Sequence, residues 1–216
     1  MSRFALSIFL NHSILFAAIA GVIRFKSVLK SYYPFLVFVW LAFANETLSL
    51  VLILTGRRNA INSNVYVLFE YLILLYQFYK WYAGTAKKLY FFAVPGILIW
   101  IADNLVLHSL SDNNSLFRSV SALVLLFFSI DRMNRVIVYY NRNLLTNSVF
   151  LVCASFLPYY GCKLFLELFH LYGIPLSSDF YEYTWLTLSV INCAANLVYA
   201  IAILCMPTKE EFMLLY

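Results

Sequence analysis

Charged residues are scarce in this chain: they make up 12% of its 216 residues, whereas 63% are hydrophobic. A water-soluble domain usually carries about twice that share of charge, because its surface faces water. A fold of this length could bury a sizeable core, but it could not hide this much apolar surface. The shortage of charge therefore excludes an ordinary soluble domain and indicates that lipid is the solvent for much of the protein.

Glycine, histidine and cysteine are also few, and each shortage removes a class of chemistry. The six glycines form no phosphate-binding loop, and no G-x-S-x-G nucleophile motif occurs. The three histidines are spread over separate apolar segments, unlike the clustered ligands of a metallohydrolase. The four cysteines lie within apolar runs and form no C-x-x-C pair. We therefore predict no catalytic residue and no metal ligand, which favours a non-catalytic protein.

The excess of basic residues is small, at a net charge of +5, and these residues flank apolar segments. A nucleic-acid partner would require a basic soluble face, and the sequence provides none. No cofactor is identified either, although gaps between aromatic-rich helices could accommodate a bound lipid.

Seven apolar segments of about the length needed to cross a bilayer follow one another along the chain. They cover approximately residues 4–23, 34–55, 64–83, 88–108, 115–138, 144–171 and 182–205. Strand-like alternation is missing, and the short connections hold turn residues. We predict an all-α polytopic membrane protein, a bundle of seven transmembrane helices that forms a single domain over residues 1–216.

The distribution of Lys and Arg predicts the orientation of this bundle. Ten basic residues fall on the side that includes the C-terminal tail: Arg24, Lys26, Lys30, Lys80, Lys87, Lys88, Arg132, Arg135, Arg142 and Lys209. The opposite side has four: Arg3, Arg57, Arg58 and Arg118. Because the cytoplasmic side is usually richer in Lys and Arg, we expect the N-terminus outside and the C-terminus in the cytoplasm of a cell membrane.

Ionisable side chains within predicted spans are the candidate site, because each costs several kcal/mol in a bilayer and tends to face an interior or a wet cavity. Five of them are expected at similar depth in the outer half, as candidates for a ligand or ion pocket: Glu46, Glu70, Asp103, Lys163 and Glu167. Neutral or weakly basic residues would support them: His12, Asn45, Asn192 and Asn196. The alternative is a buried, neutralised network that only fixes helix packing. For His12 in particular, a packing role competes with a role in the pocket.

Two prolines within predicted spans should disturb their helices. Pro158, followed by Gly161, is expected to kink the sixth span near mid-membrane and to free a backbone carbonyl. Pro95 and Gly96 are expected to act similarly in the fourth span. Such irregular segments are tolerated at depth where they are buried or line a cavity.

The third and seventh spans, NVYVLFEYLILL at residues 64–75 and SVINCAANLVYAI at residues 189–201, carry a family resemblance together with the sixth span. They resemble a group of uncharacterised small seven-helix integral membrane proteins of Bacteroidota, which have a glutamate in the third span and asparagine in the seventh. The resemblance covers about half of the chain and implies a bacterial inner membrane, but no activity. Leu188 stands where that group often has a histidine, which weakens the case for a shared site.

Two classes of function fit these observations. The first is a non-catalytic membrane module, either a sensor-like protein that binds a small ligand or an accessory subunit that assembles with other membrane proteins. The second is a transporter or channel-like protein that uses the outer acidic cluster for a cation or proton. Transporters usually have repeated halves with paired broken helices, and the sequence shows no matching repeat, so transport ranks second.

Overall fold

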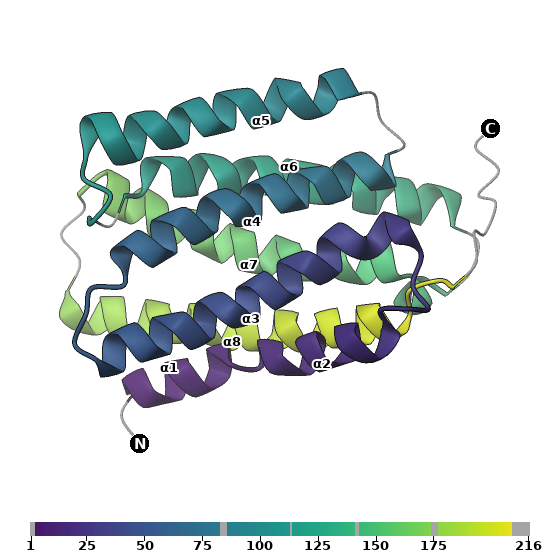
Figure 1. Cartoon of the computed structure of the whole chain (residues 1–216), viewed down its shortest axis with the longest axis horizontal. Coiled ribbons are helices and arrows are strands. Elements are labelled where there is room, and N and C mark those ends of the chain that lie inside the picture. Colours follow the sequence, from purple (N-terminus) through teal and green to yellow (C-terminus); the bar gives the residue numbers. More distant parts are fainter. Residues whose placement is uncertain (1–2, 83–85, 113, 141–142, 174–176, 209–216) are drawn as a thin grey trace.

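The computed structural model describes residues 3–82, 86–112, 114–140, 143–173 and 177–208 (Figure 1). All regular structure in these ranges is helical. The elements are α1 (Arg3–Asn11), α2 (Ile14–Arg24), η1 (Lys30–Tyr32), α3 (Tyr33–Leu54), α4 (Ala60–Trp81), α5 (Ala86–Ile101), η2 (Ala102–Leu107), α6 (Leu116–Tyr139), η3 (Leu144–Thr146), α7 (Ser148–Leu171) and α8 (Ser178–Leu204). The all-α prediction is confirmed for the described part of the chain.

Five helical segments of the described chain are long and apolar enough to cross a membrane: Ala5–Arg24, Lys30–Leu54, Leu89–Leu107, Ser148–Leu171 and Glu182–Leu204. Large apolar side chains are exposed along them, for example Val22, Leu54 and Val106. In water these would form patches far larger than a soluble monomer shows, whereas in a bilayer they face lipid. These are the properties of a membrane-embedded protein.

The remaining long helices, α4 and α6, have 22 and 24 residues and lie within the same bundle. They carry more polar side chains, including Glu70 in α4 and Arg118 in α6. Both side chains are buried within the protein, so they contribute polarity without facing lipid.

The helices lie side by side along the long dimension of the molecule (Figure 1). Neighbours along the chain pack together from α2 to α4, and α5 packs against α4 and α6. The pairs α6–α7 and α7–α8 follow, and α8 returns to pack against both α1 and α2. The first and last helices therefore share one side of the bundle.

An aromatic cluster fills one half of this bundle, between the start of α3, the end of α4, the start of α7 and the end of α8. Phe35 and Phe38 pack edge-on against Tyr199, with ring centroids 5.5 and 6.1 Å apart. Phe156 lies 5.7 Å from Tyr199 and 6.3 Å from Phe78. Each ring is buried, and edge-to-face contacts of this kind add to the burial of apolar area.

One predicted span is interrupted at a place that the sequence did not indicate. The first predicted span is divided at His12 and Ser13, between α1 and α2. Helical structure continues through Pro95 in α5 and through Pro158 in α7, so neither proline ends its helix, and the kinks expected there stay predictions. A π-helical turn, η2, follows directly after α5. A proline does not by itself interrupt these helices, whereas the polar pair at the α1–α2 junction does.

Side chains from α8 hold the break between α1 and α2. The Asn192 amide nitrogen donates to Asn11 Oδ1 over 3.0 Å, and the Asn196 amide nitrogen donates to Ser13 Oγ over 3.0 Å. The two asparagines lie one helical turn apart, so they present both amides to the same neighbouring segment. They supply polar partners to backbone and side chains that would otherwise be left unpaired in an apolar surrounding.

Gln77 of α4 provides hydrogen-bond partners for backbone groups at the N-terminal end of α3. Its side-chain oxygen accepts a hydrogen bond from Phe35 N over 2.8 Å, and its side-chain nitrogen donates to Ser31 O over 2.9 Å. Gln77 is buried, and the first amide groups of a helix have no partner within the helix. One side chain therefore satisfies a donor of α3 and an acceptor of η1.

Gly96 allows α4 and α5 to approach closely. A Cβ atom at this position would overlap Tyr71 Cε1 and would lie 3.0 Å from the Tyr71 hydroxyl oxygen. That hydroxyl donates to Phe92 O over 2.9 Å, in the turn that precedes Pro95 and Gly96. Position 96 must therefore be glycine for the Tyr71 ring to occupy its place between α4 and α5.

We expect Gly96→Ala to lower the free energy of unfolding by about 1–3 kcal/mol, because the added methyl group forces the Tyr71 ring out of its place. Gly161→Ala is the matched control: a Cβ there meets nothing within 4 Å, so the change should be neutral or should stabilise α7 by about 0.5–1 kcal/mol. Thermal or SDS-induced unfolding of the purified protein measures both. Equal effects at the two positions would show that the Tyr71–Gly96 contact does not limit packing.

Candidate functional site

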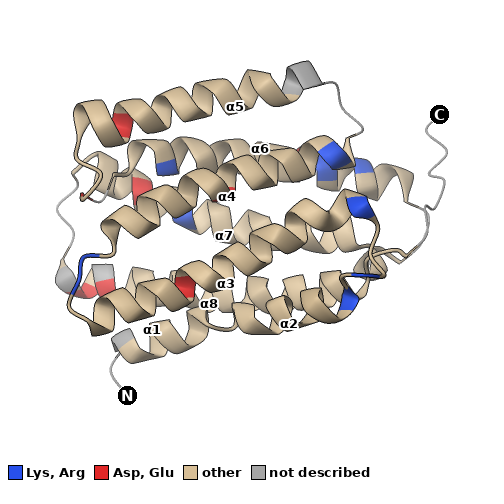
Figure 2. Cartoon of the chain, viewed as in Figure 1, with Lys and Arg blue, Asp and Glu red and all other residues tan. Residues whose placement is uncertain are grey.

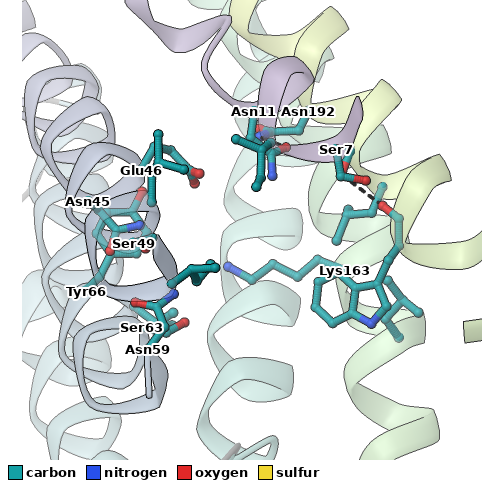
Figure 3. Close-up of a pocket in the computed structure, with 18 of the residues that line it drawn as sticks. Ser7, Asn11, Asn45, Glu46, Ser49, Asn59, Ser63, Tyr66, Lys163 and Asn192 are labelled. Carbon is teal, nitrogen blue, oxygen red and sulfur yellow. Dashed lines mark hydrogen bonds between the residues drawn. The ribbon is translucent and has the colours of Figure 1, made fainter. Parts of the chain in front are cut away.

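A cavity of about 1160 Å³ occupies the half of the bundle opposite the aromatic cluster. It lies where α3 and α7 end and where α4, α6 and α8 begin, beside the second half of α1. α3 and α4 form one wall, and α1, α7 and α8 stand across from it (Figure 3). Ligand sites usually have volumes of roughly 300–1,000 Å³, so this space is large enough for an organic ligand.

The structure brings most of the predicted site residues to this cavity. The lining includes His12, Asn45, Glu46, Lys163, Glu167 and Asn192. Glu70 and Asn196 lie deeper, beside a smaller space of about 40 Å³ that Glu46 and Asn192 also line. Glu46 from α3 and Lys163 from α7 point into the main cavity from opposite walls (Figure 3).

Lys163 is anchored at the floor of the cavity by Glu70. Its Nζ lies 3.1 Å from Glu70 Oε2, while the Tyr160 hydroxyl donates to Glu70 Oε1 over 2.8 Å. The ammonium group also lies 5.6 Å from the ring centroids of Tyr159 and Tyr160. Glu70 is 2% exposed, and both of its oxygens therefore have a partner in a place that water hardly reaches.

Arg118 of α6 forms a second buried group of polar contacts. Its guanidinium donates to Ser63 Oγ over 2.9 Å and to Asn64 Oδ1 over 2.7 Å, both on α4. Its Nη1 lies 3.6 Å from Glu167 Oε1, and the other oxygen of Glu167 accepts a hydrogen bond from Ser115 Oγ over 2.6 Å. These contacts tie α4, α6 and α7 together at the side of the cavity.

Asp103 does not join this cavity. Its Oδ2 accepts a hydrogen bond from Phe117 N, in the first turn of α6, over 2.8 Å, and its Oδ1 lies 3.1 Å from His108 Nδ1. A carboxylate at a helix N-terminus satisfies a free amide and complements the helix dipole. Asp103 therefore fixes the start of α6 relative to η2, and the lining of the cavity does not include it.

Glu46 differs from every other carboxylate that has a role in or beside the cavity. It makes no hydrogen bond or ion pair within the described ranges of the chain, although it is half-buried. The two cations of the lining, Lys163 and Arg118, already pair with Glu70 and Glu167. The cavity therefore presents a carboxylate with no hydrogen-bond or ion-pair partner among the described residues, although His12 and Lys163 lie close enough to attract its charge.

His12 lies beside the break between α1 and α2 and lines the cavity. Its Nδ1 contacts Ile8 O at 2.8 Å, so one ring nitrogen is used within its own helix. Asn45 is tied to the neighbouring helix, because its Oδ1 accepts a hydrogen bond from the Asn62 amide over 2.9 Å. Both side chains thus shape the wall as well as facing the space.

Sequence reasoning placed Arg118 at the rim and missed its buried role. The residue is already within the predicted span 115–138, and Ser63 and Asn64 lie near the same end of the neighbouring span. A basic residue just inside a span, opposite amide and hydroxyl side chains at the same depth, was the available signal. The aromatic residues of the lining, Tyr66, Tyr159 and Trp185, could not be separated from the many other aromatics of the chain.

The fold and the cavity together define a helical membrane protein with an internal polar site. We found no matching family model, no similar characterised protein and no similar solved structure. The resemblance to small seven-helix proteins of Bacteroidota stays a hypothesis. The function is therefore argued from the geometry of the cavity.

Removing one partner of the buried pair should destabilise the bundle. We expect Lys163→Met to lower the free energy of unfolding by about 3–5 kcal/mol, because it leaves the Glu70 carboxylate buried without its cation. The double variant Glu70→Gln with Lys163→Met should regain most of that loss. Lys80→Met, at an exposed lysine, is the control. If Lys163→Met and Lys80→Met change the free energy of unfolding by the same amount, the Glu70–Lys163 pair does not hold α4 to α7.

Proposed function

We propose that the protein is a non-catalytic membrane module that binds a small ligand in the cavity between α1, α3, α4, α7 and α8. The observation that carries this proposal is a large cavity of mixed polar and apolar lining, with a carboxylate on its wall, Glu46, that has no hydrogen-bond or ion-pair partner among the described residues. A network whose only role was packing would be expected to pair this charge, as it pairs Glu70 and Glu167. An accessory role beside other membrane proteins is compatible with such a module and stays a prediction.

The proposal includes the seven-span topology, with α4 and α6 crossing the membrane together with the five more apolar segments. Both helices have the length to span a bilayer and lie alongside the others in one bundle. Lys and Arg are frequent at the end where α2, α4 and α6 end, and most Asp and Glu lie toward the other end (Figure 2). This asymmetry supports an external N-terminus and a cavity that faces the exterior.

The aromatic packing on the far side of the cavity favours binding over transport. The buried aromatic cluster around Phe35, Phe156 and Tyr199 occupies the opposite half of the bundle. A transport path would have to pass these rings, whereas a binding site can end on them. The broken first helix beside the cavity is the one observation that favours transport, because transporters often bind substrates at interrupted helices.

Cysteine labelling tests the cavity and its orientation together. In a variant whose four native cysteines are replaced by alanine, we expect Ser49→Cys to react with a membrane-impermeant thiosulfonate added outside the cell, because Ser49 lines the cavity. Thr47→Cys, on the exposed side of the same helix, should react at least about tenfold more slowly, because a thiol in lipid does not ionise.

Labelling of Ser49→Cys only from the cytoplasmic side would contradict the proposed orientation. Equal rates for the two cysteines would contradict a water-accessible cavity.

A flux measurement separates binding from transport. In vesicles that contain the purified protein and a pH-sensitive or Na⁺-sensitive dye, we expect no flux above that of empty vesicles, because the aromatic half closes the path. A proton or Na⁺ flux that Glu46→Gln abolishes would establish transport in place of simple binding. Thr47→Val, next to Glu46 but exposed, serves as the control for effects of reconstitution.

A further inference from the structure

The charges of the cavity indicate the class of ligand, on the condition that the proposed function is correct and the cavity binds one. The two cations that line it are each matched by a carboxylate, Lys163 by Glu70 and Arg118 by Glu167. Glu46 remains as an acceptor that no donor of the described chain reaches. A ligand that brings a positive charge can pair with Glu46, as Lys163 pairs with Glu70.

A second acceptor faces the same space. Asn192 uses its side-chain nitrogen to donate to Asn11, and its side-chain oxygen receives no hydrogen bond from the described residues. Asn192 and Glu46 both line the main cavity and its smaller extension, from opposite walls (Figure 3). An ammonium group has three N–H donors, so it can use a carboxylate and an amide oxygen at once.

The rest of the wall suits an organic body more than a bare ion. Ile8, Leu50, Ile53, Leu166 and Leu188 line the cavity. The lining also includes Tyr66 and Trp185, whose ring faces attract an ammonium group. Inorganic cations would need several hard oxygen atoms converging on one point, whereas this wall alternates oxygen and hydrocarbon.

We infer that the cavity binds a primary ammonium ion that carries an apolar group, with Glu46 as its counter-ion and Asn192 as a second acceptor. The apolar part lies along the leucine and isoleucine side chains, and the paired residues Lys163 and Arg118 give the cavity its polar floor and side without competing for Glu46. Two sources supply such a group in a membrane: a free hydrophobic amine, and the headgroup of phosphatidylethanolamine.

Three probes with the same phenylethyl group test the charge preference on the purified full-length protein in detergent: 2-phenylethylamine, 2-phenylethanol and 3-phenylpropanoate. Isothermal titration at neutral pH should show the amine binding at least about tenfold more tightly than the alcohol, and the carboxylate most weakly. Glu46→Gln keeps the shape of the side chain and removes its charge. In that variant the affinity for the amine should fall to that of the alcohol, and Thr47→Val should retain the wild-type preference.

The outcomes separate the two levels of the proposal. If the alcohol binds and the amine has no advantage, or if the advantage survives in Glu46→Gln, the ammonium inference is overturned while a ligand-binding cavity stands. If none of the three probes binds the folded protein, the inference is overturned, and the labelling of Ser49→Cys then decides whether the proposed cavity stands. Binding of the carboxylate above the amine would assign the site to Lys163 or Arg118 instead.

Nanodiscs distinguish the two sources of the ammonium group. If the native occupant is a lipid headgroup, phosphatidylethanolamine should weaken the binding of 2-phenylethylamine relative to phosphatidylglycerol, and Glu46→Gln should remove the difference. Equal affinity in the two lipids, still dependent on Glu46, assigns the site to a free amine. Affinity that depends on neither the lipid nor Glu46 contradicts the inference.

Discussion

The ion pair between Glu70 and Lys163 is the interaction on which the polar half of this bundle depends. It joins α4 to α7 at the floor of the cavity, and Tyr160 completes the hydrogen bonding of the carboxylate. Without it, both charges would face an apolar interior at a cost of several kcal/mol. At the side of the cavity Arg118 likewise pairs a buried charge with partners on other helices, and so joins α4, α6 and α7. The walls are held by paired charges, whereas Glu46 has no such partner within the described ranges of the chain.

The two halves of the bundle are held together by different kinds of contact. Aromatic rings fill one half with contacts that require no polar partner, so that half can pack without water. The other half contains the interrupted first helix and the cavity, where each buried polar atom needs a specific neighbour. There the side-chain nitrogen of Asn192 clamps the break at Asn11, while its oxygen remains directed to no donor of the described chain.

Composition and hydropathy were sufficient to predict the helices, because a bilayer permits few alternatives to a helix of about 20 apolar residues. The depth argument also brought Glu46, Glu70, Lys163 and Glu167 to the same region, since residues at equal depth on neighbouring helices meet. It could not exclude Asp103, because depth does not specify which side of a helix faces the cavity. The break at His12 and Ser13 was missed for a similar reason: it depends on two amides of α8, which are about 180 residues away along the chain.

Gln77 has a consequence for the order in which the chain can be assembled. The Phe35 amide of α3 and the carbonyl of Ser31 obtain partners from a side chain near the end of α4. During synthesis α3 emerges first, and it obtains these two hydrogen bonds only after Gln77 has been made and has reached the same depth. In a bilayer such unsatisfied groups are costly. The two helices are therefore completed as one hairpin, and α3 reaches its final state only when the ribosome has passed the end of α4.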